Sequence, residues 1–402
     1  MVNGTKTTAL TATAMVSMLA LDQASANALT DAINGGTPNV DYRIRAEMVE
    51  QDGFTEDAEA FTQRLRLGYR TGSVGGFMGF VEFEHVDALG AEKYNSTQNG
   101  KTEFPVVADP EGTEVNQVYL DYAGVPDTLF RLGRQRLILD NARFVGNVGW
   151  RQNEQTFNAV KVENKSLTNT VLSYSYLDKS NTILFGEVDL EGHLVNATVK
   201  PVDWASITAY GYFLDFEVDT GPTKDTKTFG LRVTGGVPLG QDVKLNYTAE
   251  YADQSDYADA TDIVDADYYW VGVGVTFANV LFSVDQEVLS GDGTYNFQTP
   301  LATKHAFNGW ADKFLGDLIA GGDGLVDTMV KAQVTVSGFK FMAVYHDFSG
   351  DESGDDFGTE LDLLISKSFT PNLSGLVKYA DYDADTFATD TRKFWVMANY
   401  KF

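Results

Sequence analysis

The chain ends on the stretch TDTRKFWVMANYKF, residues 389–402. Within it, every second residue from Phe394 to Phe402 is apolar, and the residues between them are mixed in character. A period of two produces one apolar face only in a β-strand, because successive strand side chains point to opposite faces. The stretch therefore predicts a strand that finishes the chain. Taken alone, it is also compatible with a half-buried strand of a soluble sheet.

The first 26 residues have the pattern of a secretory signal peptide. Lys6 supplies a positive charge, residues 9–20 form an apolar segment, and Ala24-Ser25-Ala26 is a small-residue cleavage site. A disordered N-terminus or a short helix is the alternative for these residues. We expect residues 1–26 to be removed and residues 27–402 to form a single domain. No other stretch approaches the roughly 18 consecutive apolar residues of a transmembrane helix.

Composition narrows the class of protein further. The chain has no Cys, and its 57 acidic and 30 basic residues give a net charge of −27. Nucleic-acid binding requires a basic face, so this acidic excess argues against it. The 19 Tyr, 26 Phe and 5 Trp contradict disorder, which is typical of chains with few aromatic residues. A mean hydropathy of −0.19 is compatible with a membrane barrel, in which only alternate strand residues meet lipid.

The alternating pattern recurs along the whole of residues 27–402 and predicts eighteen strands, an even number as in bacterial single-chain barrels. The expected strands are 39–50, 60–71, 76–86, 114–123, 127–136, 156–164, 169–178, 188–199, 204–215, 227–236, 241–252, 267–277, 279–289, 327–337, 339–348, 358–368, 373–382 and 390–402.

The connections between these strands alternate strictly between short and long. Every second connection is a tight turn, and the longest of the others are 87–113, 137–155, 253–266 and 290–326. Tight turns on one side and loops on the other are typical of an outer-membrane barrel, with periplasmic turns and extracellular loops. A soluble sandwich has Greek-key crossovers instead. We therefore expect an all-β fold, a closed up-and-down antiparallel transmembrane barrel, in the bacterial outer membrane.

A strand that ends on Phe is also typical of such barrels, because the barrel assembly machinery reads this kind of C-terminus. If the barrel is closed, residues 390–402 must pair with the first strand, 39–50. We then expect Lys393, Asn399 and Lys401 to face the lumen beside the first strand's inward residues.

Alternation also assigns side chains to the lipid or to the lumen. On the first strand Tyr42, Ile44, Ala46 and Met48 take the lipid side, and Asp41, Arg43, Arg45 and Glu47 take the lumen side. Charges on the lipid face are costly, so the restriction of charge to one parity supports the assignment. The inward charged residues expected on the second to fifth strands are Arg64, Arg66, Arg70, Glu82, Glu84, Asp121 and Arg131.

Arginine is concentrated on the first, second and fifth strands, which carry eight of the twelve arginines: Arg43, Arg45, Arg64, Arg66, Arg70, Arg131, Arg134 and Arg136. A basic lumen would concentrate and steer anions inward. The alternative is a ladder in which inward Arg and Glu pair and only stiffen the wall.

Much of the acidic excess of the chain falls in loops rather than on strands. The run DESGDD at 351–356 is a candidate for Ca²⁺ or for cation-bridged lipopolysaccharide, although its spacing fits no defined calcium loop.

Two blocks carry a family resemblance. Residues 133–160, GRQRLILDNARFVGNVGWRQNEQTFNAV, closely resemble a block of the alginate-export family of outer-membrane porins. Residues 303–314, TKHAFNGWADKF, match that family's pattern in its longest loop. The chain departs from the pattern at Lys304-His305-Ala306-Phe307, where Leu-His-Lys-Phe is usual, and at Asn158, where Asp is usual.

The resemblance implies an arginine-rich constriction that passes an anionic polysaccharide and is gated by loops. It implies no cofactor, and it suggests a monomer surrounded by lipid and lipopolysaccharide. The positions that carry over as constriction or inward-loop candidates are Arg134, Arg136, Asp140, Arg143 and Arg151. The positions that carry over to the gating loop are Trp310, Asp312 and Lys313. From its pattern alone, we expect a short amphipathic helix over residues 311–320 of that loop.

The sequence favours passive diffusion of anionic solutes, including alginate-like polysaccharide or its oligosaccharides, through an Arg-lined lumen. The alternatives are a general or otherwise specific diffusion porin, and a structural or adhesive barrel with a plugged lumen. An enzyme is disfavoured. His346 and Asp347 form the only adjacent His–Asp pair, and neighbouring residues on a strand point to opposite faces.

Overall fold

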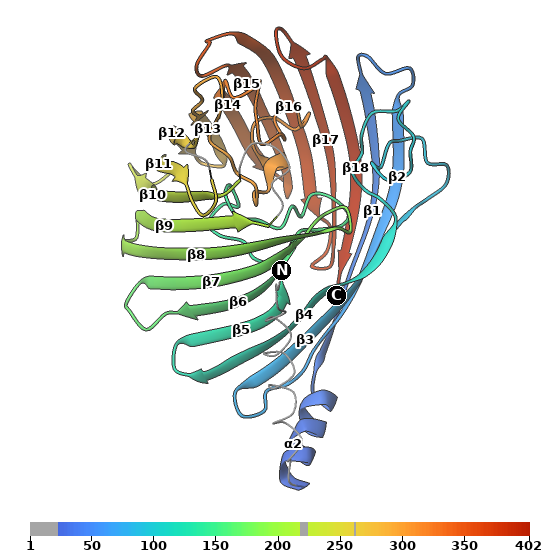
Figure 1. Ribbon diagram of the computed structural model, residues 1–402, viewed down its shortest axis with the longest axis vertical. Coiled ribbons are helices and arrows are strands. Elements are labelled where there is room, and N and C mark those ends of the chain that lie inside the picture. The colour runs from blue at the N-terminus through green and yellow to red at the C-terminus, as the bar shows by residue number, and fades with distance from the viewer. Residues whose placement is uncertain (1–22, 218–223, 261–262) are drawn as a thin grey trace, which may run out of the picture.

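The computed structural model describes residues 23–217, 224–260 and 263–402, and it shows a closed β-barrel (Figure 1). Eighteen strands form one antiparallel sheet in which each strand pairs with its neighbours in sequence, and β1 also pairs with β18. The predicted all-β, eighteen-stranded up-and-down barrel is therefore confirmed. Closure leaves no strand edge unpaired, which is the condition for a sheet surrounded by lipid.

The eighteen strands correspond one to one with the predicted strands and differ from them by a few residues at their ends. Their bounds are β1 (Thr37–Gln51), β2 (Ala58–Arg70), β3 (Phe77–Ala88), β4 (Gly112–Val125), β5 (Thr128–Gln135), β6 (Thr156–Asn164), β7 (Thr170–Asn181), β8 (Glu187–Val202), β9 (Ala205–Phe216), β10 (Thr226–Pro238), β11 (Val243–Asp256), β12 (Asp265–Phe277), β13 (Val280–Leu289), β14 (Leu325–Val336), β15 (Phe339–Ser349), β16 (Asp356–Ser368), β17 (Leu373–Ala384) and β18 (Thr391–Lys401).

The short connections all lie at one end of the barrel, as the sequence predicts. Several are two-residue hairpins whose backbone adopts positive φ, for example Asp127 (55°), Ala278 (51°) and Ser337 (51°) with Gly338 (77°). Positive φ at the turn matches the twist of the flanking strands. The long loops lie at the opposite, extracellular end, and two of them, 136–155 and 290–324, run back inside the barrel (Figure 1).

The outer face is apolar where it would meet lipid. On β12, Val271, Val273 and Val275 are 64%, 54% and 42% exposed, whereas the inward Tyr268 is fully buried. Aromatic residues are also exposed at the periplasmic rim, including Phe277, which ends β12. An apolar band with aromatic residues at its borders is what a bilayer selects.

The last strand closes the barrel against the first, as predicted. Asp41 is paired with Lys401, and Arg43 with Asn399. The side chains of Lys393 and Asn399 are buried on the lumen side. Lys401 lies at the periplasmic rim and is mostly exposed, but its ammonium group is 3.3 Å from the Asp41 carboxylate. Trp395, on the same parity as Lys393, is fully buried inside the lumen.

Two helices bear on the sequence predictions. Helix α2 (Gln23–Asn34) lies below the periplasmic rim (Figure 1), and the backbone N–H of Gly72 donates to the carbonyl oxygen of Ala32 at 2.8 Å. The expected signal peptide lies mainly in residues 1–22, outside the described residues, so its cleavage stays a prediction. No helix in the described part of the chain is long and apolar enough to cross a membrane.

The amphipathic helix expected over residues 311–320 is wrong. That stretch consists of turns, and the only helical turn in its loop is the 3₁₀ segment Lys304–Ala306. Positive φ at Asp312 (63°) and Ala320 (46°) breaks the helical path. The apolar residues Phe314 and Ile319 are buried nonetheless, because the loop packs as a folded turn against the wall.

Closure can be tested by cross-linking across the seam between β1 and β18. Ile44 is paired with Ala398, and both point to the lipid side. In an Ile44→Cys/Ala398→Cys variant we expect efficient cross-linking by a short thiol reagent, because directly opposite Cβ atoms lie about 5 Å apart. The chain has no Cys of its own to interfere, and the product is read as a gel shift of the unfolded protein.

The matched control is Ile44→Cys/Phe394→Cys. Phe394 is paired with Met48, four residues further along β1, roughly 14 Å away. Equal cross-linking of the two pairs, or none in the first pair, would contradict the closed register.

Candidate functional site in the barrel lumen

Four arginines from β1 and β2 lie side by side on the inner wall. Alternation points Arg43 and Arg45 of β1 inward, and the register places Arg43 opposite Arg64 of β2, with Arg66 next to it. All four side chains are buried; Arg64 is 0% exposed. Buried charge is costly unless it is paired and hydrogen-bonded, so this cluster requires partners.

The first set of partners is the backbone of the inward loop 136–155. One guanidinium nitrogen of Arg43 lies 3.1 Å from each of three carbonyl oxygens, those of Gly149, Trp150 and Arg151. Arg45 donates to the Trp150 carbonyl at 2.6 Å. Carbonyl oxygens have no intraloop partner when a chain turns sharply, and the arginines supply donors for them. The loop is thereby held inside the barrel.

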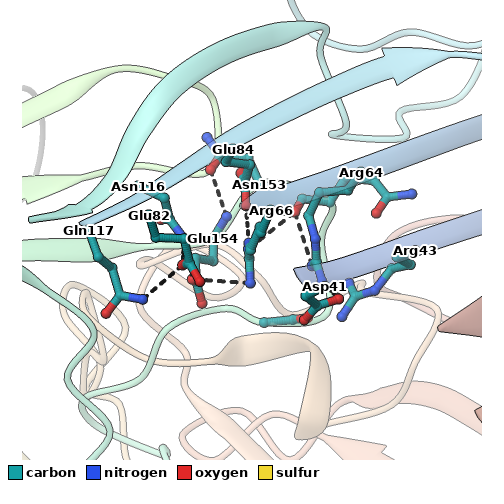
Figure 2. Close-up of polar contacts among 12 residues, drawn as sticks. Asp41, Arg43, Arg64, Arg66, Glu82, Glu84, Asn116, Gln117, Asn153 and Glu154 are labelled. Carbon is teal, nitrogen blue, oxygen red and sulfur yellow. Dashed lines mark hydrogen bonds and ion pairs between the residues drawn. The ribbon is translucent and has the colours of Figure 1, made fainter. Parts of the chain in front are cut away.

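The second set of partners is a group of buried carboxylates (Figure 2). Arg66 pairs with Glu84 of β3 and, at 3.2 Å, with Glu154 of the inward loop. Glu154 also accepts from the Arg136 Nε at 2.7 Å, and it is fully buried. Amide donors complete the group: Asn116 Nδ2 lies 2.8 Å from both Glu154 and Glu82.

The remaining arginines of the cluster are paired in the same way. Arg64 contacts Asp41 at 2.7 Å, and Arg45 pairs with Asp109, which comes from the loop between β3 and β4. On β5, Arg131 contacts Asp121 at 2.6 Å. On the inner wall, these arginines and carboxylates therefore form a ladder of ion pairs, which was the alternative to an open basic lumen. These guanidinium groups face protein carboxylates and carbonyls, which limits their capacity to face a passing solute.

The second inward loop, 290–324, is anchored through Asp312. Its carboxylate lies 2.6 Å from His305 Nδ1, 2.8 Å from Lys393 Nζ of β18, and 3.2 Å from the Arg151 guanidinium of the other loop. Burial alone would raise the pKa of Asp312, but His305, Lys393 and Arg151 hold the pKa well below its usual range. Asp312 thus remains ionised and ties both loops to the last strand.

His305 is held as a neutral imidazole. Its Nε2 lies 2.8 Å from Lys378 Nζ, and an ammonium group only donates, so Nε2 accepts and Nδ1 carries the proton donated to Asp312. Burial, together with the charge of Lys378, lowers the pKa of His305 well below its usual range. The Trp150 ring stacks on His305 at 4.4 Å.

Aromatic side chains pack around this anchor and fill the upper lumen. Lys378 of β17 lies over the Trp310 ring at 3.6 Å and the Trp150 ring at 4.2 Å. On the opposite wall, Phe144 of the first inward loop packs against Tyr210 and Tyr268. The two loops therefore contact inward side chains around much of the barrel, and residues 149–155, GWRQNEQ, are packed within it.

The other residues predicted for the site lie outside the arginine cluster. Arg143 contacts Glu287 of β13 at 2.6 Å, and Asp140 accepts from Asn196 of β8 at 2.8 Å. Arg134 of β5 pairs with Glu187 at 3.0 Å near the extracellular rim and donates to Asn158 Oδ1 at 3.2 Å. Lys313 is described below.

Several residues that organise the lumen were not predicted. Glu154, Asp109, His305 and Trp395 are all buried there. Glu154 and His305 lie within the two blocks that resemble the family, so the resemblance could have identified them as candidate site residues. For Asp109 the sequence held none, because its partners are 64 and 42 residues away in sequence and meet it only once the loops fold inward.

A cavity of ≈ 660 Å³ opens at the extracellular mouth, above the Asp312 anchor. We call it the mouth cavity. Its lining residues are Gln51, Phe54, Val106, Ala108, Val148, Arg151, Gln155, Thr182, Ile183, Pro300, Ala302, Lys304, His305, Ala311, Asp312, Lys313, Leu315, Ala388, Thr389 and Lys393. Among these, four are cationic at neutral pH and Asp312 alone is acidic.

Lys313 is the least compensated cation of the mouth cavity. It forms no ion pair with any residue in the described part of the chain. Burial and the nearby charge of Lys393 lower the pKa of Lys313 to about 8, against weaker opposing effects of Glu360, Asp312 and Asp390. Burial of the ammonium group is the main cause of this shift, and an anion that paired with Lys313 would offset it.

The acidic run at 351–356 and the His346–Asp347 pair lie in different parts of the structure, the run after β15 and the pair on it. In that part of the chain, no group of three or more His, Cys, Asp or Glu side chains is placed to hold a metal ion. Asp351 of the DESGDD run instead accepts the backbone N–H of Gly291 at 3.1 Å. His346 contacts Asp327 at 2.9 Å inside the barrel, whereas Asp347 points to the outer face.

Comparisons with known proteins show which family this chain matches. A family model described as alginate export matches residues 38–309, more than half of the chain. A search of the curated proteins found no match.

Solved structures from Pseudomonas aeruginosa share the fold. OccK5 (OpdH) is 13% identical, with a TM-score of 0.71 over 92% of this chain and 98% of that one. OpdK, solved with vanillate, is 12% identical, with a TM-score of 0.71 over 91% and 98%. OccD3 (OpdP) is 15% identical, with a TM-score of 0.68 over 93% and 92%. Given its closed barrel, its lipid-facing apolar band and the family match, the chain belongs to the alginate export family of outer-membrane barrel proteins.

Proposed function

We propose that this porin mediates passive diffusion of anionic solutes that enter through the mouth cavity. The observation that carries the proposal is the charge of that cavity: Arg151, Lys304, Lys313 and Lys393 line it, and Asp312 is its single acid. A basic cavity in a low-dielectric wall concentrates anions and raises their rate of capture. The OpdK structure was solved with vanillate, a carboxylate, which accords with an anionic solute.

Alginate-like polysaccharide or its oligosaccharides are one candidate within this class, and family membership favours them. The packed inward loops restrict the passage of a polysaccharide through the lumen. A polymer would have to displace the contacts of Asp312 and Glu154, whereas a small anion needs only local opening. We propose that a monomer surrounded by lipid and lipopolysaccharide carries out this transport, without a cofactor and without any enzymatic step.

A structural barrel with a plugged lumen is the competing function, and the packing of the upper lumen favours it. Ion current separates the two directly. A plugged barrel shows no steps of conductance in a planar bilayer, whereas a diffusion channel does.

Charge reversal at Lys313 tests the anion proposal. Under a salt gradient, the wild-type reversal potential should indicate anion selectivity. In Lys313→Glu we expect the anion-to-cation permeability ratio to fall by roughly two- to fivefold at about 0.1 M salt, where charges act over ~10 Å. The matched control is Lys93→Glu, on an exposed extracellular loop, which should leave the ratio unchanged. A cation-selective wild type would refute the proposal.

The depressed pKa of Lys313 predicts a pH effect. Because this pKa is about 8, Lys313 loses its charge as the pH rises through that value. Anion selectivity should therefore decline between about pH 7 and about pH 9, well below the usual lysine range near 10.4. In Lys313→Arg, whose charge persists, selectivity should stay constant over that interval. The same decline in the arginine variant would assign the titration to another group.

Weakening the first inward loop tests whether it limits the current. Glu154→Gln leaves Arg66 and Arg136 without their shared carboxylate, which should cost about 3–5 kcal/mol of docking free energy. We expect larger and noisier single-channel conductance. Glu163→Gln is the control, since Glu163 pairs with Lys161 and Lys165 at the periplasmic end and touches no inward loop. Identical currents in the two variants would mean that the loop does not restrict the path.

A further inference from the structure

The mouth cavity has an apolar wall as well as a charged one. Half of its lining residues are apolar, and four of the larger ones, Phe54, Val106, Ile183 and Leu315, come from four different extracellular loops. Val106 and Leu315 are 43% and 42% exposed. These loops lie beyond the lipid-facing strands, so neither the bilayer nor the fold requires apolar side chains at these positions. Exposed apolar surface that converges on one cavity marks a binding site.

Four cations line the same cavity. Arg151 and Lys393 share Asp312, and Lys304 contacts Asp317 at 2.7 Å, so each has a carboxylate already. Lys313 is the exception, since it pairs with no residue that the structure describes. One cationic group of the lining therefore remains for a ligand.

The amide and hydroxyl side chains on the lining, Gln51, Gln155, Thr182 and Thr389, already have partners within the protein. Gln155 Nε2 donates to the carbonyl oxygens of Gly146 and Leu301 at 2.9 and 3.1 Å, Gln51 Nε2 donates to Thr389 Oγ1 at 3.5 Å, and Thr182 Oγ1 donates to the Gly186 carbonyl at 3.3 Å. A sugar acid carries hydroxyl groups around its ring, and each would lose hydrogen bonds to water without finding a partner here. A carboxylate with an apolar body has no ring hydroxyl groups to desolvate, its charged group can pair with Lys313, and burial of its apolar surface is favourable.

We propose that the mouth cavity is a binding site for a small monocarboxylate with an apolar body, such as an aromatic acid, whose carboxylate contacts Lys313. This inference rests on the proposed function, because it names the class of anion that the mouth selects. The cavity volume of ≈ 660 Å³ falls within the roughly 300–1,000 Å³ typical of small-molecule sites.

Calorimetric titration of the detergent-solubilised full chain tests the proposal with three probes. Benzoate has the charge and the apolar ring, galacturonate has the charge with hydroxyl groups, and benzyl alcohol has the ring without the charge. We expect benzoate to bind at least about tenfold more tightly than either of the other two. Comparable affinity for galacturonate would overturn the proposal in favour of a sugar-acid site.

Two variants separate the charged contact from the apolar one. Lys313→Ala should weaken benzoate binding by about tenfold and leave benzyl alcohol unchanged. Leu315→Ser should weaken benzoate binding and leave galacturonate unchanged. The control Lys93→Ala, in an exposed ion pair with Glu59, should alter none of the affinities. Unchanged benzoate affinity in both Lys313→Ala and Leu315→Ser would place the binding elsewhere and overturn the proposal.

Reversal potentials on the same preparation distinguish this inference from the proposed function. Anion selectivity combined with equal binding of benzoate and galacturonate would overturn only the aromatic-acid site. Cation selectivity would overturn the proposed function, whatever the calorimetry gives.

Discussion

The lumen is organised by the interaction between the arginines of β1 and β2 and the backbone of the loop that folds down onto them. Arg43 binds three consecutive carbonyl oxygens of residues 149–151, and Glu154 of the same loop neutralises Arg66. Neither side is stable alone, because the arginines would be buried charges and the loop would lack donors. Together they convert a hollow barrel into one with a packed extracellular half.

Because of this pairing, the positive charges that a solute can contact are those at the extracellular mouth, and not those of β1 and β2. The arginines that the sequence predicts as the lining of the lumen are paired with protein carboxylates and carbonyl oxygens. The cations that remain for a solute line the mouth cavity. Asp312 links the two levels, since it contacts Arg151 of one loop and Lys393 of the last strand. An anion that competed with Asp312 for Arg151 and Lys393 would weaken contacts that hold both inward loops.

The fold was predictable because strand alternation and turn length are local properties. The eighteen strands, the closure between β1 and β18, and the inward parity of Arg43, Arg45, Arg64 and Arg66 all follow from them. The site was less predictable, since its contacts join residues that are distant in sequence: Lys378 meets His305 across 73 residues. The local pattern also predicted a helix at 311–320, where the structure has turns. It did not indicate that Tyr210 and Phe297 would belong to an apolar core inside the barrel.

Hydrogen–deuterium exchange resolved by residue tests the central claim, that loop 136–155 is docked inside the lumen by the arginines. The amides of Gln152 and Gln155 donate to Asp109 and to the Asn147 carbonyl in the packed interior. They should exchange as slowly as the amides of strand β1 and much more slowly than those of the exposed loop 52–57. Exchange of residues 149–155 at the rate of loop 52–57 would show an undocked loop and would contradict this account of the lumen.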